Sequence, residues 1–424
     1  MKYTDMSAAE LQAELRAVDA AYSEFKAKGL KLDMSRGRPA ANQLDLSNDL
    51  LNILQPEDIK IQAGLDARNY ALPDGLPECR ALFAQLFEVP ADQVIAGGNS
   101  SLKMMFDIIS SGMTHGYGFG PWGAVPGGIK FLCPSPGYDR HFAVTEYFGV
   151  QNIAVPMTAE GPDMAEVRRL CENDPSVKGI WCVPKYSNPQ GITYSKATVE
   201  ALAAMKPAAP DFKIMWDNAY VVHELTDTPD ELHNIFDAAR AAGTEDRVVS
   251  FASTSKITFA GAGVAAVAAS PEMIKLIKKR LVIESIGPDK VNQLRHVRLL
   301  PDVAAVKNKM KRQADIIAPK FKLVLETLER ELGNLGILSW TNPKGGYFIS
   351  VDTMPGCADR VVALCAEAGA VLTGAGATYP YGKDPNDSNI RIAPTVPPID
   401  ELKIAAELFV VAVKKASLEK LMGS

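Results

Sequence analysis

The sequence predicts an α/β protein in which helices cover both faces of a mainly parallel sheet, together with a smaller α+β domain. Two observations predict this fold class. Apolar, β-branched stretches alternate with helix-length stretches from about residue 55 to residue 300, which is typical of parallel strands joined by helices. Beyond that point, long helical segments lead into a short mixed pattern of strands and helices.

The length of 424 residues favours two or three domains, because one domain typically has roughly 100–200 residues. We predict an N-terminal helix and segment at 1–54, a large domain at 55–302 and a small C-terminal domain at 303–424, which the N-terminal segment joins. The helix at 8–28 should end at Gly29, because glycine is favoured just beyond a helix.

The expected elements follow from the period of the apolar residues and from the turn residues. Strands of the large domain are expected at 128–133, 177–184, 212–216, 248–252 and 264–269, and helices at 77–86, 102–109, 165–172, 195–205, 229–242 and from 271. The helical stretch at 303–332 should kink or break near Pro319, because proline lacks the amide hydrogen. Later elements are expected at 345–349, 358–368, 370–372, 390–392 and from 399.

The composition excludes several classes of protein. A net charge of −5 gives no general attraction to nucleic acid or to anionic lipid. No stretch approaches the roughly 18 apolar residues of a membrane helix. The first 29 residues lack the apolar core of an export signal, so we expect a cytoplasmic protein. The six cysteines form no C-x-x-C pair and the five histidines lack metal-ligand spacing, so we expect no metal site.

One segment allows several interpretations. Residues 111–127 are rich in glycine and aromatic residues and show no clear period. They fit a lid over a site, a contact between subunits or a packed surface loop.

Three polar groups each follow an apolar stretch that we expect to be a buried strand. They are Asn188 in Asn-Pro-Gln-Gly, Asp217 with Tyr220 in Asp-Asn-Ala-Tyr, and Lys256 in Ser-Thr-Ser-Lys. A lysine that meets a carboxylate, an amide and a phenol is a candidate Schiff-base residue, because a desolvated ε-amine becomes nucleophilic. Alone, each group also fits an ordinary turn, cap or surface position.

A glycine-rich turn, Gly97-Gly98-Asn99-Ser100-Ser101, precedes the helix expected at 102–109. Backbone N–H groups and hydroxyls at the start of a helix can bind an anion. The turn is not a P-loop, because the Gly-Lys-Ser/Thr ending is missing. Residues 261–266 fit the G-x-G-x-x-A dinucleotide pattern, but they lack the clean strand before it and the amphipathic helix after it.

In this order, the motifs resemble those of the fold-type I aminotransferases that depend on pyridoxal 5′-phosphate (PLP). The resemblance extends from Gly37 to Arg391. The blocks 35–39, 97–101 and 253–263 are similar to a divergent bacterial branch of aspartate aminotransferases. The resemblance implies a large PLP-binding domain and a homodimer with shared active sites.

The resemblance also implies roles for the matching residues. Lys256 would form the Schiff base with PLP and then carry a proton between the substrate Cα and the cofactor. Asp217 would pair with the pyridinium nitrogen of the cofactor. Tyr220 and Asn188 would donate hydrogen bonds to the phenolic oxygen, and Tyr138 would stack on the pyridine ring.

The expected phosphate site is the turn described above. By resemblance, Ser100, Ser101 and Ser253 would bind the cofactor phosphate, and Tyr70 would reach the phosphate in the partner subunit. One departure is clear. The family usually places an arginine about eight residues after the lysine, but residues 257–264 contain no basic residue.

The expected substrate site centres on Arg391, which by resemblance would hold the α-carboxylate with its planar guanidinium fork. The backbone of Gly37 and the side chain of Asn188 would assist it. The side-chain carboxylate of the substrate needs a second cation, and the sequence does not identify one residue for it. Candidates for that role are Arg36, Arg38 and Lys290.

The function implied is amino transfer from aspartate to 2-oxoglutarate by a ping-pong route, with an amino acid and a 2-oxo acid as substrates. An aminotransferase for aromatic or other amino acids, or another PLP enzyme such as a β-lyase, would share every cofactor residue. A non-catalytic effector-sensing domain of a transcription regulator would need an attached DNA-binding module, which we do not expect in this chain.

Overall fold

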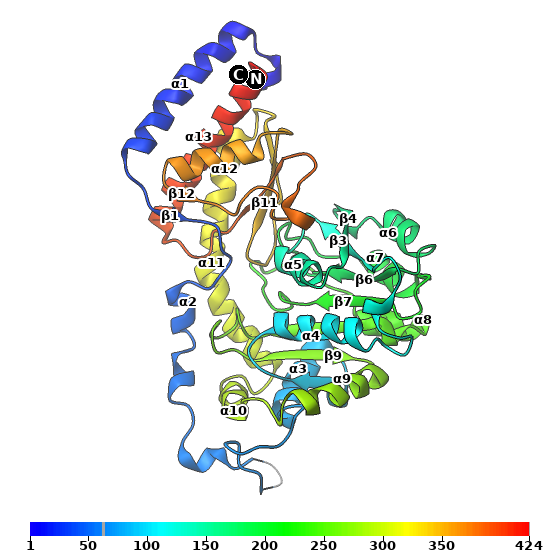
Figure 1. Ribbon diagram of the computed structural model, residues 1–424. Coiled ribbons are helices and arrows are strands. Elements are labelled where there is room, and N and C mark those ends of the chain that lie inside the picture. The colour runs from blue at the N-terminus through cyan, green and yellow to red at the C-terminus, as the bar shows by residue number, and fades with distance from the viewer. Residues whose placement is uncertain (62–63, 424) are drawn as a thin grey trace.

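The computed structural model describes residues 1–61 and 64–423, and an eight-stranded sheet lies at its centre (Figure 1). In spatial order, the strands are β2 (Val94–Ala96), β9 (Ala265–Ala269), β8 (Val248–Ser253), β7 (Lys213–Asp217), β6 (Val177–Cys182), β3 (Lys130–Ser135), β4 (Gln151–Thr158) and β5 (Gly161–Pro162). The pairs from β8 to β4 are parallel, while β9 and β5 run antiparallel to their neighbours. The predicted mainly parallel sheet is confirmed.

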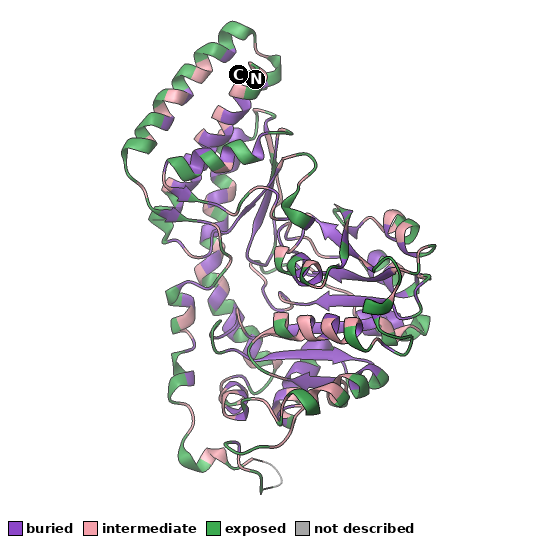
Figure 2. Cartoon of the chain, viewed as in Figure 1, coloured by how far each residue is buried: buried purple, intermediate pink, exposed green. Residues whose placement is uncertain are grey.

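Helices cover both faces of this sheet, as predicted. One face carries α3 (Pro77–Phe87), α6 (Met164–Cys171), α7 (Lys196–Ala204), α8 (Ile235–Ala242) and α10 (Lys290–Leu299). The other carries α4 (Ser101–Thr114), α5 (Asp139–Tyr147) and α9 (Pro271–Glu284). Within β6, Ile180 belongs to the first apolar cluster and Trp181 to the second, because successive strand residues point to opposite faces. Figure 2 shows the resulting buried sheet between half-exposed helices.

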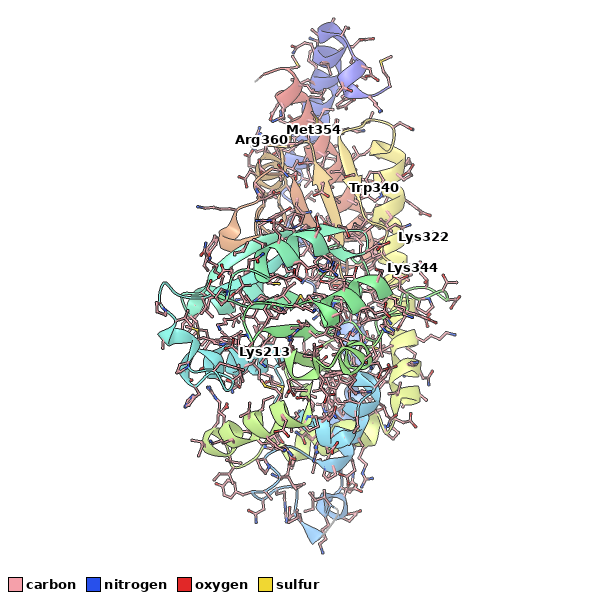
Figure 3. All side chains as sticks on the ribbon, turned by 90° about the vertical axis from the view of Figure 1, so that its right-hand side faces the viewer. Lys213, Lys322, Trp340, Lys344, Met354 and Arg360 are labelled. Carbon is pink, nitrogen blue, oxygen red and sulfur yellow. The ribbon has the colours of Figure 1, made fainter. Side chains whose placement is uncertain are left out.

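The remaining elements form a second, smaller body around their own apolar cluster. They are α1 (Ala8–Ala27), β1 (Leu32–Asp33), β10 (Leu338–Trp340), β11 (Ile349–Thr353), α12 (Ala358–Glu367), β12 (Ala370–Val371), β13 (Asn389–Ile392), α13 (Ile399–Leu421) and most of α11 (Val303–Leu332). The first turns of α11 pack on the large sheet through Val306 and Met310, and the short helix α2 (Ala41–Asp45) lies against α11. Strand β11 lies between β10 and β13, antiparallel to both. Figure 3 shows Trp340 and Met354 in this upper body and Lys213 in the lower one.

The N-terminal segment packs on this smaller body, although it is far from it in sequence. Strand β1 pairs with β12 in parallel, with Leu32 opposite Ala370. Helix α1 lies beside α13 (Figure 1), where Lys415 binds Asp19. The N-terminal segment thus joins the C-terminal elements.

Three expected elements differ from the structure. Helix α8 begins at Ile235 rather than at 229, because the Asn234 side chain caps it by accepting hydrogen bonds from Phe236 N and Asp237 N. Helix α11 continues through Pro319, so of the two predicted alternatives, a kink or a break, the break is wrong. Ile317 and Phe321, buried on either side of the proline, pack in the same apolar cluster, which holds the helix together across the missing hydrogen bond.

The third difference is strand β11, which begins at Ile349 rather than at 345. The two glycines before it pack against the Tyr186 side chain, and Gly346 adopts a φ of +84° that a strand residue does not. Strand β4 and helices α5 and α10 were not expected at all. None of the described helices is long and apolar enough to cross a membrane.

The segment 111–127 is packed onto the large sheet. Trp122 is 1% exposed, and its Nε1 donates a 2.7 Å hydrogen bond to Asp211 Oδ2. The hydroxyl of Tyr117 donates to the carbonyl of Ile108 at 2.6 Å. Of the three interpretations, a packed loop describes this part of the segment.

Candidate active site

The predicted site residues gather where the parallel strands end. Asp217 is the last residue of β7, and Ser253 the last of β8. Asn188 follows β6, and Tyr138 precedes α5 after β3. Because the carboxyl ends of parallel strands share one edge of a sheet, this edge is where α/β proteins place their ligand sites.

Lys256 lies on this edge between two aromatic rings. Its Nζ is 5.2 Å from the centre of the Tyr220 ring and 5.8 Å from that of Tyr347. Burial lowers the pKa of Lys256, the charge of Asp217 opposes this shift, and the charge of Arg391 adds to it. The environment therefore favours the neutral, nucleophilic amine.

Asp217 is held from one side only. Its Oδ2 lies 2.9 Å from His141 Nε2, and the His141 ring stacks on Trp181 at 4.5 Å with an angle of 12°. The other oxygen, Oδ1, is buried and has no hydrogen-bond partner among the described residues. A buried carboxylate oxygen without a donor is costly, so Asp217 suits a ligand that brings a proton donor.

Two tyrosines border the same space. Burial, and then the charges of Asp217 and Asp139, raise the pKa of Tyr138 to about 12. The Tyr220 hydroxyl is buried, and desolvation raises its pKa well above the ordinary value. Both phenols therefore stay protonated near neutral pH and can act as hydrogen-bond donors.

Arg391 is fixed by polar groups from three segments. Its Nη1 donates to Asp139 Oδ1 at 3.0 Å and to Asn188 Oδ1 at 3.2 Å, and its Nη2 donates to Thr373 Oγ1 at 3.4 Å. The guanidinium carbon lies 4.8 Å from the centre of the Phe348 ring.

Gly37 lies against the same ring. A Cβ at this position would come 2.3 Å from Phe348 Cζ, so only glycine fits. The structure thus places Gly37 and Arg391 on one aromatic ring, close to Asn188.

The glycine-rich turn and the segment after β8 are joined by hydrogen bonds. Ser100 caps α4, and Ser101 is its first residue. Asn99 Nδ2 donates to Gly261 O at 3.1 Å, and Ser255 Oγ donates to Asn99 O at 3.4 Å. Ser253 Oγ donates to Ser255 Oγ at 3.1 Å. Three serine hydroxyls therefore border the N-terminus of a 14-residue helix, a setting that suits an anion.

The position where the family places an arginine is filled by an apolar residue. Val264 is 1% exposed, and its N–H donates to Thr254 Oγ1 at 2.9 Å. Helix α10 supports both loops of the anion site from behind. Asn292 Nδ2 donates to Gly263 O at 2.9 Å, and Gln293 Nε2 donates to Gly97 O at 3.0 Å.

Four predicted residues lie outside this cluster of contacts. The Tyr70 ring is 75% exposed and has none of the contacts described above. Arg36 and Arg38 are exposed on either side of Gly37, whereas Lys290 is 4% exposed at the start of α10. Burial lowers the pKa of Lys290.

Sequence analysis missed several residues of the site, above all His141. It lies three residues after Tyr138, on the same side of α5, with their ring centres 4.9 Å apart. The i,i+3 spacing would have revealed this pair, but only once α5 had been predicted. Tyr347 and Gln43 were missed because they come from distant segments. Gln43 Nε2 donates to the Tyr347 hydroxyl at 3.0 Å.

The sequence pattern of the aspartate amino-transferase family matches residues 6–424. This chain belongs to the aspartate aminotransferase family. The resemblance inferred from the motifs is confirmed, and the protein is an aminotransferase. An aspartate aminotransferase of Corynebacterium glutamicum is 46% identical over 400 residues, which cover 94% of this chain and 92% of that protein.

Solved structures support the family and its fold. The crystal structure of an aspartate transaminase from Corynebacterium glutamicum has a TM-score of 0.96 and 44% identity, and covers 99% of each chain. The structure of LysN, an α-aminoadipate aminotransferase from Thermus thermophilus, has a TM-score of 0.75 at 19% identity and covers 94% of this chain. The second likeness shows the shared fold alone.

The residues of this edge fit the cofactor that the family implies. The unpaired carboxylate oxygen of Asp217 suits the ring nitrogen of PLP. The lysine with the lowered pKa suits its aldehyde, and the serine hydroxyls at the helix N-terminus suit its phosphate. Metal ligation fits less well, because the described residues contain no group of three or more histidine, cysteine or acidic side chains that could hold a metal ion.

Proposed function

We propose that this aminotransferase uses PLP, covalently attached to Lys256, to transfer the amino group of aspartate to 2-oxoglutarate by a ping-pong route. The proposal depends above all on the setting of Lys256. Its Nζ lies 5.2 Å from the centre of the Tyr220 ring, and its pKa is lowered by burial and influenced by the charges of Asp217 and Arg391. The choice of aspartate is supported by the relative named aspartate aminotransferase at 46% identity.

When bound, PLP supplies an aldehyde that takes up the amino group and a ring that accepts electrons from the breaking Cα–H bond. Lys256, as a neutral amine, would remove the proton from the substrate Cα and return it on the cofactor side. Asp217 would hold a proton on the ring nitrogen, and His141 would keep the carboxylate aimed there. Tyr220 would donate a hydrogen bond to the phenolic oxygen of the cofactor.

Arg391 would hold the α-carboxylate of the substrate, because a guanidinium binds a carboxylate through two parallel N–H groups. Asn188 accepts a hydrogen bond from Arg391, and its amide N–H groups would donate to the phenolic oxygen of the cofactor. Ser100, Ser101 and Ser253 would bind the phosphate, with the α4 dipole supplying part of the missing arginine's charge. We assign the second substrate carboxylate to no single residue among Arg36, Arg38 and Lys290.

We also propose a homodimer with shared active sites. The exposed ring of Tyr70 would be covered by the partner subunit and would reach its phosphate. Light scattering of the purified protein should give twice the mass of 45.7 kDa. A monomer that is fully active would contradict shared sites.

The test of the proposal is a panel of amino donors with 2-oxoglutarate. Aspartate should give glutamate faster than aromatic or neutral donors, and an absence of glutamate would refute the substrate. The protein soaked with PLP should absorb in the near-ultraviolet or violet, and reduction with borohydride should fix the cofactor to a peptide that contains Lys256. Lys256→Ala should lose both the fixation and the turnover. Lys322→Ala, at an exposed position on α11 (Figure 3), is the matched control.

A further inference from the structure

Arg391 is paired with a carboxylate of the protein itself. Its Nη1 lies 3.0 Å from Asp139 Oδ1, and the side chain of Arg391 is 9% exposed. A guanidinium buried to this extent requires a counter-charge. Asp139 provides this charge on Nη1, one of the two terminal nitrogens to which a substrate carboxylate would bind.

Asp139 can leave Arg391 at little cost. Its side chain is 35% exposed, so water can solvate the carboxylate once it turns away. It is the first residue of α5 and does not cap that helix, since the N-cap residue is Tyr138. By contrast, Asn188, the other partner of Nη1, is 5% exposed and therefore held by its surroundings.

The guanidinium has room for a further acceptor. Its Nε is buried and has no hydrogen-bond partner among the described residues. Within the described part of the chain, its Nη2 donates a hydrogen bond only to Thr373 Oγ1, at 3.4 Å. A carboxylate that binds through both Nη atoms needs the Nη1 that Asp139 occupies, and two carboxylates on one guanidinium repel each other, so the incoming carboxylate competes with Asp139.

We propose that Asp139 is a positioning residue that occupies Arg391 between turnovers and competes there with the α-carboxylate of the substrate. The inference rests on the function proposed above, in which Arg391 binds that carboxylate. Competition multiplies the apparent association constant of both substrates by the fraction of molecules in which Arg391 is free of Asp139. It also favours release of the product, because Asp139 returns as the product carboxylate leaves.

The test is Asp139→Asn in the PLP-loaded protein, with maleate as a dicarboxylate that cannot take part in amino transfer. Calorimetric titration should show the Kd for maleate falling about two- to fivefold, as expected for the loss of a partly exposed charge pair. The KM values for aspartate and 2-oxoglutarate should fall together, without a rise in kcat. Asp237→Asn is the control, because Asp237 also lies in the first turn of a helix beside an arginine but far from Arg391 in the fold.

An unchanged or higher Kd for maleate in Asp139→Asn would overturn the inference, because it would mean that Asp139 does not compete with the ligand. Asp139→Ser provides a second variant if Asp139→Asn melts at a lower temperature. Failure of the proposed function looks different: the wild-type protein would make no glutamate from aspartate, and Arg391→Lys would leave maleate binding unchanged.

Discussion

His141 Nε2 lies 2.9 Å from Asp217 Oδ2, and the two side chains are 1% and 6% exposed. The stack of His141 on Trp181 fixes the imidazole in place. The pair therefore aims the free oxygen of Asp217 at the edge of the sheet where Lys256 lies. We therefore expect substitutions of His141 and of Asp217 to lower kcat.

His141→Asn should lower kcat roughly ten- to hundredfold, because a hydrogen bond to a charged group contributes about 1.5–3 kcal/mol. Without it, the Asp217 carboxylate can turn away from the ring nitrogen of the cofactor. Steady-state kinetics with aspartate would measure the loss. His233→Asn is the control, since the His233 side chain is 31% exposed and its Nε2 lies 3.9 Å from Glu200 Oε1, outside the candidate active site. An unchanged kcat in His141→Asn would show that Asp217 needs no orientation.

Asp217→Asn should lower kcat by at least about a hundredfold, because a neutral amide cannot keep the ring nitrogen of the cofactor protonated. The melting temperature should not fall in parallel, since the carboxylate is buried with one oxygen unpaired. Calorimetry of the variant, beside its kinetics, separates the two effects. A variant that melts early and is inactive would indicate a structural role instead.

Arg391→Lys should raise the KM for aspartate about tenfold or more, because an ammonium cannot bind a carboxylate through two parallel N–H groups. The kcat should change less than KM. Arg360→Lys on α12 serves as the control: Arg360 binds Glu419 through two nitrogens on the surface, and it is labelled in Figure 3 far from the large sheet. Equal KM values in both variants would remove Arg391 from the substrate site.

The sequence predicted most of the large sheet, because its central strands are continuous apolar runs that end in turn residues. Strand β4 was missed because its burial alternates irregularly, from exposed Gln151 to buried Val155. Helix α5 was missed because its short sequence carries a histidine and an arginine among few apolar residues. Since α5 carries both Asp139 and His141, the partners of Arg391 and Asp217 could not be predicted.

The residues named from motifs fared differently from those that required tertiary contacts. Lys256, Asp217 and Asn188 share one edge of the sheet because each lies at or shortly after the end of a parallel strand. These strands could be predicted from their apolar runs in the sequence. Gln43 reaches Tyr347 from a helix about 300 positions away, and the printed sequence gives no sign of such a contact. The predicted contact of Tyr70 would lie in another subunit, so the packing of a single chain leaves its ring exposed.

Removing the buried partner of Lys178 should destabilise the fold. Asp211 accepts from Lys178 Nζ at 2.7 Å and from Trp122 Nε1 at 2.7 Å, and both ionic side chains are almost fully buried. Asp211→Ala leaves a buried ammonium unpaired, which costs about 3–5 kcal/mol. Thermal unfolding should show a clear loss of Tm. Asp237→Ala, at an exposed pair, should change Tm little, and equal losses in both would contradict the argument.

Lys213 should make the protein more stable as the pH rises above 8. Burial lowers the pKa of this lysine to about 8, whereas the unfolded chain keeps the ordinary value near 10.4. Between these values the folded chain has lost the proton and the unfolded chain retains it, so unfolding takes up a proton. The free energy of unfolding then rises by up to about 1.4 kcal/mol per pH unit. Below pH 8 both states carry the proton, and the full cost of burying the charge remains.

Lys213→Met should remove this part of the pH dependence. Comparison of urea unfolding at about pH 8 and about pH 10 should give a rise for the wild type that exceeds the rise for the variant by roughly 1–3 kcal/mol. Other lysines titrate in both proteins, so their contribution cancels in the difference. The variant also loses the 2.8 Å hydrogen bond from Lys213 Nζ to Asp246 O. Both the charged and the neutral amine can donate this bond, so its loss lowers the stability at both pH values and does not explain a change in the pH dependence. Equal rises in the two proteins would mean that Lys213 keeps its charge in the folded chain throughout this range.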